Sequence, residues 1–160
     1  MDSLILKSGI SANPKWIWTQ NSKKPNSWVC FRKEIFLSDI SGDKNAIIAV
    51  DSKYWLWVNG ESVIFEGGLN RGPKPGCGYY DRIELKKYLK KGKNTIAILV
   101  WYWGNSGRNS VDSGSGGLLF EMDNKGNYIQ SDENWKAIVH PAYFETTDPN
   151  PSYLYAGHNI

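Results

Sequence analysis

The residues with the clearest chemical use in this 160-residue chain are aromatic rings that stand beside polar loop residues. Trp101 and Trp103 lie two apart at the end of an apolar run, so both side chains leave a strand on the same side, about 6–7 Å apart. Asn105 and Arg108 follow in the next loop. Sugar rings pack their C–H faces on aromatic rings, while their hydroxyls need a few fixed polar partners. This stretch therefore predicts one wall of a carbohydrate site.

A second loop supplies the opposite wall of the predicted site. Residues 67–78 are rich in glycine and proline, and they carry Asn70 and Arg71 shortly before Tyr79. A loop of this length is long enough to suggest a role beyond connection. If both loops lie at the same end of the fold, they form a cleft with an aromatic floor and an amide and guanidinium rim. The alternative is that the two tryptophans pack in the core or against a neighbouring domain, and the sequence leaves both readings open.

Hydrolytic chemistry has no recognisable motif in the chain. Glycoside hydrolysis by the common route needs two carboxyl groups that face one another across roughly 5–10 Å. No pair stands out, and we expect each of the following carboxylates on the surface or in a turn: Asp51, Glu61, Glu66, Asp81, Glu84, Asp112 and Glu121. His140 and His158 lack the serine or cysteine context of a catalytic triad. We therefore predict no catalytic residue and no hydrolysis by this chain alone.

Metal and cofactor motifs are not recognisable either. Cys30 and Cys77 do not match the four-ligand spacing of a structural zinc site, and we expect reduced thiols, with one disulfide as the alternative. Residues 112–115 could offer oxygens to Ca²⁺, but the twelve-residue calcium-loop pattern is missing, so a flexible loop is favoured and structural calcium is not readable. The run GNSGRNS lacks the lysine of a phosphate-binding loop.

Composition narrows the classes of partner. The net charge of +3 is too weak a field to indicate nucleic acid or an anionic membrane as a partner. The start, MDSLILKSGI, is less apolar than a signal peptide, whose apolar region needs roughly 7–15 residues, so cytoplasmic localisation is the default expectation. Aromatic residues make up 14% of the chain, more than one small core needs. Some rings should therefore face solvent or a partner.

Short strands must position these rings. Residues 47–60, IIAVDSKYWLWVNG, and residues 94–104, NTIAILVWYWG, are dense in β-branched and aromatic residues, and both end at glycine. Within residues 54–58 the two tryptophans occupy one face and Tyr, Leu and Val the other. Asn59-Gly60 tolerates positive φ and predicts a hairpin into residues 62–66, in the middle of a β-sandwich.

Further strands complete an all-β pattern. They are predicted at residues 15–19, 28–37, 79–84, 118–122, 128–130 and 132–139, with a single helical turn at residues 85–89. About eight short strands and one helical turn predict an antiparallel β-sandwich of the jelly-roll type. Residues 1–14 are predicted to be a flexible lead-in, residues 15–139 the sandwich, and residues 140–160 a linker or the start of a following domain.

Several motifs, in this order, resemble one family. They are KWIW, FRKEIFL, YWLWVNGESV, YYDRIELKKYLKKGKNTIAILVWYWG, GGLLF and DENWK. Together they resemble the N-terminal β-sandwich domain of bacterial α-L-rhamnosidases, glycoside hydrolases whose catalytic part is a separate helical barrel. They are more loosely similar to the galactose-binding-like jelly rolls. The resemblance covers residues 16–139 and is most specific in residues 54–63 and 79–104.

The resemblance implies an accessory role. The family's catalytic acid and base lie in the barrel, which a chain of 160 residues is too short to contain. The implied partner is thus the catalytic domain of the same polypeptide, with rhamnose-containing glycans as a ligand class. Two rival hypotheses remain: a free-standing sandwich that binds a protein, and a small hydrolase in its own right.

Overall fold

The computed structural model describes residues 14–20, 24–68, 79–105 and 114–143. Within these residues the chain forms nine strands and one 3₁₀ turn. The strands are β1 (Ser27–Leu37), β2 (Asn45–Asp51), β3 (Lys53–Val58), β4 (Glu61–Gly67), β5 (Asp81–Glu84), β6 (Gly92–Tyr102), β7 (Gly117–Met122), β8 (Ile129–Gln130) and β9 (Lys136–Val139). The 3₁₀ turn covers Lys86–Tyr88.

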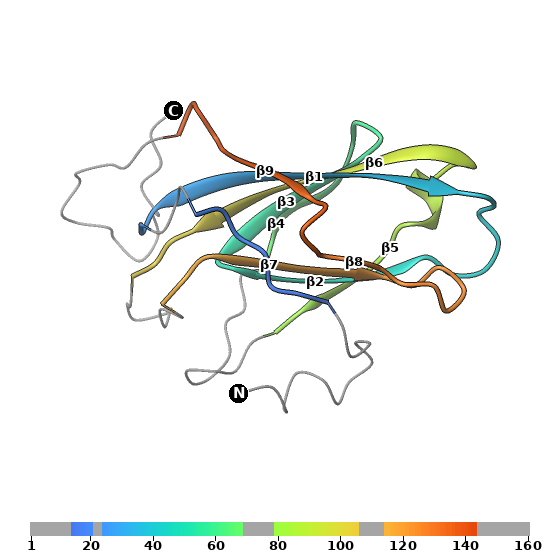
Figure 1. The fold of residues 1–160 in the computed structure, drawn as a ribbon, viewed down its shortest axis with the longest axis horizontal. Helices are drawn as coiled ribbons and strands as arrows, with labels where there is room; N and C mark the ends of the chain where they lie inside the picture. The colour runs from blue at the N-terminus through green and yellow to red at the C-terminus, as the bar shows by residue number, and fades with distance from the viewer. Residues whose placement is uncertain (1–13, 21–23, 69–78, 106–113, 144–160) are drawn as a thin grey trace.

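Two antiparallel sheets lie face to face as two layers (Figure 1). The five-stranded sheet has the order β4-β3-β6-β1-β9, and the four-stranded sheet has the order β5-β2-β7-β8. The predicted all-β sandwich with one short helical turn is therefore confirmed. Among the described residues, no helix is long and apolar enough to cross a membrane.

The core lies between the two sheets and follows the two-residue period of the strands. Ile96, Ile98 and Val100 of β6 point inward and are buried, as are the alternate residues of β3. Full burial of one such side chain stabilises the fold by about 1.5–3 kcal/mol. The predicted alternation of residues 54–58 is confirmed, because Tyr54, Leu56 and Val58 face the core while the tryptophans face outward.

The stretch at residues 47–60 is not the single strand that its composition predicts. β2 ends at Asp51 and belongs to the four-stranded sheet, whereas β3 begins two residues later in the other sheet. The buried Ser52 makes the crossing, and its backbone N–H donates to the Trp101 carbonyl at 2.6 Å. The apolar pattern is continuous across Ser52, since both strands bury side chains, so composition does not change where the sheet changes.

The β3–β4 hairpin is confirmed, but its place in the sandwich was predicted wrongly. Asn59 and Gly60 have φ of +54° and +84°, as a two-residue hairpin turn with both central residues left-handed requires. β4 ends the strand order, so the hairpin lies at the edge of the five-stranded sheet.

Two short segments differ from the predicted strands. Residues 15–19 make one isolated bridge, between Ile17 and Leu118, and no continuous strand. The last strand begins only at Lys136, because residues 132–135 form a turn in which the Trp135 N–H donates to the Asp132 carbonyl at 3.3 Å. Both differences shorten an element without changing the architecture.

Candidate functional site

The outer face of the five-stranded sheet carries an aromatic cluster, which we call the tryptophan face: Trp28, Trp55, Trp57, Leu99, Trp101, Trp103 and Tyr143. Its strand residues alternate with the core positions of β1, β3 and β6, and the two-residue period therefore turns them away from the core. The register sets Trp28 opposite Trp101 and Trp55 opposite Leu99. Rings from three adjacent strands thus meet on one surface.

The centre of the tryptophan face is closely packed. The Trp28 ring lies 5.2 Å from that of Trp55 and 5.6 Å from that of Trp101, between centroids. Tyr143 stacks on Trp28 at 4.1 Å with 15° between the ring planes. Trp101 is only 3% exposed, and its indole N–H donates to Asn26 Oδ1 at 2.8 Å. These rings form a second small core on the outside of the sheet.

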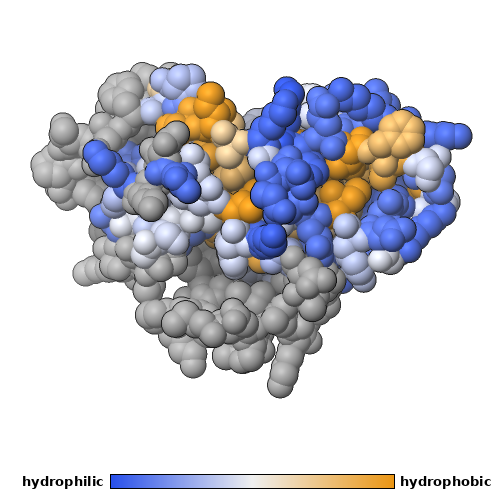
Figure 2. All heavy atoms as spheres, in the orientation of Figure 1, coloured by the Kyte–Doolittle hydropathy of each residue, from blue (hydrophilic) through white to orange (hydrophobic). Residues whose placement is uncertain are grey.

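Exposed apolar side chains surround this centre. Phe65 of β4 is 79% exposed and contacts Trp55 edge-on, with ring centroids 6.4 Å apart. Ile138 of β9 is 63% exposed and pairs with Cys30, two residues along β1 from Trp28. Phe36 is also exposed, but it pairs with Lys93 at the other end of β1 and does not belong to this group. Figure 2 shows that apolar residues also reach the surface in groups among hydrophilic ones on the side that it presents. Exposed apolar side chains beside a packed aromatic cluster favour an interaction site on this face.

Trp101 and Trp103 share this face, as their spacing predicts, but they do not form an open floor. Their ring centroids are 5.6 Å apart and their planes are tilted by 51°, so the two rings pack on one another. Lys53 Nζ lies 5.7 Å from the centroid of the Trp101 ring. A sugar cannot stack on a ring that is almost fully buried unless the ring moves, whereas Trp103 is only half-buried.

The polar residues predicted to line the sugar site are described only in part. Asn105 is exposed, and its Nδ2 donates to the Trp103 carbonyl at 3.1 Å. Tyr79 is 57% exposed. Asn70, Arg71 and Arg108 lie outside the described residues. The site itself stays a prediction.

Residues that flank the two site loops converge at one end of the sandwich. The Gly68 N–H donates to Asp81 Oδ2 at 3.0 Å, and Tyr54 Oη donates to the same oxygen at 2.8 Å. Burial and this bond to Asp81 raise the pKa of the Tyr54 phenol far above its ordinary value. The Trp103 N–H donates to Ser52 Oγ at 3.0 Å, and a Cβ on Gly68 would lie 3.2 Å from the Ser52 carbonyl. Both loops therefore start from the same end, as the predicted cleft requires.

The described carboxylates that were weighed for hydrolysis include several with structural contacts. Asp81 accepts the two bonds above, and Glu66 pairs with Lys53 at 3.4 Å. Glu121 corrects the expectation of a surface or turn position, because it is buried in β7 and accepts a bond from Gln130 Nε2 at 2.9 Å. The correction has a simple cause: every residue of β7 is buried, on both faces of the strand.

Metal ligation has no candidate cluster of three or more His, Cys, Asp or Glu in the part of the chain that the structure describes. Cys30 is a free, half-buried thiol, and burial raises its pKa. Cys77 and Asp112 lie outside the described residues, so the predictions of thiol state and of calcium there remain predictions.

Comparison with solved structures finds rhamnosidases and lectins. The chain is 32% identical to a GH78 family rhamnosidase of Bacillus sp. GL1, with a TM-score of 0.74, over 84% of this chain and 14% of that one. It is 23% identical to the Streptomyces avermitilis α-L-rhamnosidase complexed with L-rhamnose, with a TM-score of 0.59, over 84% and 12% of the chains. A Pleurotus ostreatus lectin in complex with GalNAc is 22% identical, with a TM-score of 0.54, over 78% and 36%.

These likenesses do not all support the same conclusions about the chain. The Streptomyces and Pleurotus likenesses show the fold alone, because their identities are low. No protein-family model and no curated protein matches the sequence. The chain spans about 14% of the Bacillus rhamnosidase, so activity and substrates of the whole enzyme do not transfer with the match. The resemblance carried by the motifs is confirmed: this chain is a β-sandwich similar to the N-terminal region of GH78 α-L-rhamnosidases.

Proposed function

We propose that this chain is a non-catalytic accessory domain, which docks on the catalytic domain of an α-L-rhamnosidase-like glycoside hydrolase through the tryptophan face. The observation that carries the proposal is the exposure of Phe65 and Ile138 beside a buried indole cluster on one sheet face. The centres of protein interfaces are enriched in aromatic rings and depleted of charge. The match to 14% of a rhamnosidase supports a larger polypeptide as the setting.

A chimera tests the docking role. In it, this chain replaces the matched 14% of the Bacillus sp. GL1 rhamnosidase, and the thermal midpoint is compared with that of a Phe65→Lys variant. The matched control is Tyr128→Lys, an exposed aromatic position just before β8 of the other sheet. Phe65→Lys should lower the midpoint of the chimera by several degrees, because a charge is then buried against an apolar surface.

In the isolated chain the same substitution should change stability by less than about 0.5 kcal/mol, since Phe65 is exposed there. Equal midpoints for the Phe65→Lys and Tyr128→Lys chimeras would contradict the docking role. That result would favour the rival hypothesis of a free-standing module that binds a different protein.

Carbohydrate binding at the loop end is a second function that the observations favour. Trp103 is half-buried, and the exposed Asn105 and Tyr79 belong to the flanks that converge there. Rhamnose-containing glycans are the ligand class, in keeping with the rhamnosidase likeness. A shallow site recovers about 1 kcal/mol per stacked ring, so the dissociation constant should be roughly 0.1–10 mM.

An NMR titration with L-rhamnose and rhamnose-containing oligosaccharides tests this function. Trp103→Ala should weaken binding severalfold, because it removes the ring on which the sugar stacks. Trp57→Ala is the matched control, since Trp57 is also a half-buried tryptophan of the same face but lies on β3. Amide signals of Trp103 and Asn105 that do not move at tens of millimolar sugar would remove carbohydrate binding from this end.

A further inference from the structure

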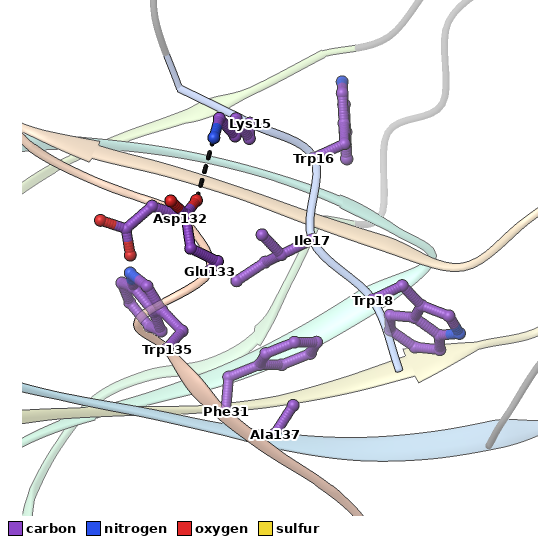
Figure 3. A pocket seen from close by; sticks show the side chains of 9 residues that line it. All are labelled: Lys15, Trp16, Ile17, Trp18, Phe31, Asp132, Glu133, Trp135 and Ala137. Carbon is purple, nitrogen blue, oxygen red and sulfur yellow. Dashed lines mark hydrogen bonds and ion pairs between the residues drawn. The ribbon is translucent and has the colours of Figure 1, made fainter. Parts of the chain in front are cut away.

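A pocket of about 310 Å³ opens at one edge of the sandwich, between the segment at residues 15–18, the turn before β9 and β9 itself (Figure 3). We call it the edge pocket and define it by its apolar lining: Ile17, Trp18, Phe31, Trp135 and Ala137. Ala137 and Phe31 pair across β9 and β1 on the inner side of the five-stranded sheet. The tryptophan face is the outer side of that sheet, so the pocket is a separate feature.

The wall contributed by residues 15–18 is held in place by backbone bonds. Ile17 and Leu118 exchange two hydrogen bonds, at 2.9 and 3.0 Å, which attach the segment to β7. Trp18 then lies directly on Gly116, where any Cβ would come within 2.4 Å of the indole ring. The pocket is therefore pre-formed, and glycine at residue 116 is a condition for its shape.

Two carboxylates at the rim of the pocket each form an ion pair, Glu133 with Lys15 of the lining and Asp132 with Lys33, which lies outside the lining. Lys15 Nζ lies 2.9 Å from Glu133 Oε2, as the dashed line in Figure 3 shows. Lys33 Nζ lies 3.1 Å from Asp132 Oδ1. The four charges sum to zero, so an ionic ligand of either sign would have to compete with an existing pair. The same groups offer ammonium donors and carboxylate acceptors, which suit hydroxyl groups.

We propose that the edge pocket binds one uncharged pyranose unit of a glycan. The C–H face of the sugar packs against the half-buried ring of Trp18, and its hydroxyls bond the Lys15–Glu133 rim. The pocket volume is at the lower end of the roughly 300–1,000 Å³ of small-molecule sites, which fits a single ring. A wholly apolar group, such as a leucine side chain, would contact the lining but use none of the donors and acceptors of the rim. The proposal is independent of the docking role and of the loop-end site.

A titration of the isolated chain tests the proposal, with L-rhamnose, D-galactose and D-glucose as neutral probes and D-glucuronate and D-glucosamine as charged ones. The indole N–H signals of Trp18 and Trp135 should shift and saturate with at least one neutral sugar at tens of millimolar. The charged sugars should bind more weakly. If no neutral sugar moves either indole signal, or if a charged sugar binds tightest, the proposal is overturned.

A pocket-filling variant locates the binding. Ala137→Phe should weaken binding about tenfold, a change of about 1.4 kcal/mol, because the new ring occupies the pocket. Ile138→Phe makes a similar change at the next residue of β9, whose side chain faces outward, and should leave the affinity unchanged. Equal affinities for these two variants would overturn the proposal.

Two more variants keep the test decisive. Lys15→Met alters an exposed rim residue without touching the core, and it should weaken binding severalfold even if Ala137→Phe fails to fold. Trp103→Ala should leave edge-pocket binding unchanged. If Trp103→Ala abolishes the response while Lys15→Met has no effect, the sugar binds at the loop end and the edge-pocket proposal is wrong.

Discussion

Replacing Trp101 by alanine should destabilise the protein much more than the same change at Trp103, although the two residues are neighbours on the tryptophan face. Trp101 is 3% exposed, contacts the rings of Trp28 and Trp103, and donates a hydrogen bond to Asn26. Trp103 is half-buried. The pair therefore compares a packed ring with a partly exposed one at almost the same place.

The expected magnitudes follow from burial. Truncating a buried tryptophan to alanine costs about 3–5 kcal/mol, and the lost hydrogen bond adds about 0.5–1.5 kcal/mol. The ring of Trp103 keeps part of its surface exposed, so Trp103→Ala should cost less, about 1–3 kcal/mol. In a chain of this size each kcal/mol lowers the melting temperature by about 2–4 °C. The Trp101 variant should thus melt roughly 7–26 °C lower than the wild type.

Urea unfolding followed by circular dichroism measures both free energies, and an unchanged slope shows that the unfolded states are comparable. A cost below about 1 kcal/mol for Trp101→Ala, or equal costs for the two variants, would refute the reasoning. The indole cluster would then contribute no packing, and Trp101 would again be a candidate platform for a sugar.

Two further predictions concern the fold. Gly67→Ala should cost more than 2 kcal/mol of unfolding free energy in the same assay, because the added Cβ would lie 2.4 Å from the ring of the fully buried Tyr54. Gly126→Ala is the control, because Gly126 has open space around it and the only strain comes from its φ of +82°. It should cost about 1 kcal/mol. Hydrogen bonds from Ser41 hold the pKa of Asp39 well below its ordinary value, so the stability from this carboxylate is present above about pH 4 and lost as the pH falls. Asp39→Asn should therefore flatten the acid side of the stability profile, and an unchanged profile would contradict this assignment.

Local chemistry was enough to predict much of the sandwich. The alternation in residues 54–58 identifies the inward and outward faces of β3, because a strand has a strict two-residue period. Asn59-Gly60 identifies the hairpin, because only such residues accept two successive left-handed conformations at low cost. Both predictions depend on neighbours in sequence, and both are confirmed.

Contacts between residues that are far apart in sequence could not be predicted from the local pattern in the same way. From its own strand Trp101 is compatible with either a sugar platform or a packed ring, and the sequence does not show that Trp28, far away in sequence, lies directly opposite and helps to bury it. The alternation of residues 28–37 did contain the signal for an outward Trp28, but the pairing of that strand with β6 is not visible without the register. The crossing at Ser52 was missed because both sheets bury the strands on either side of it.

The edge pocket illustrates the same limit. Apart from Phe31, its lining comes from residues 15–18 and from residues 132–137, at opposite ends of the sandwich sequence. The KWIW and DENWK motifs flagged both segments, yet nothing in either motif indicates that they meet. The bridge between Ile17 and Leu118 and the backbone bond from Lys15 to Ser131 bring them together.

The most direct test of the central claim is a hydrolysis assay of the purified chain with an aryl α-L-rhamnoside. A non-catalytic accessory domain should release no aryl alcohol above the buffer rate, because the common route needs a facing carboxyl pair. In the described residues, Glu66, Asp81 and Glu121 instead bond to Lys53, Tyr54 and Gln130. Turnover that survives repurification and disappears when a single aspartate or glutamate is replaced would contradict the account.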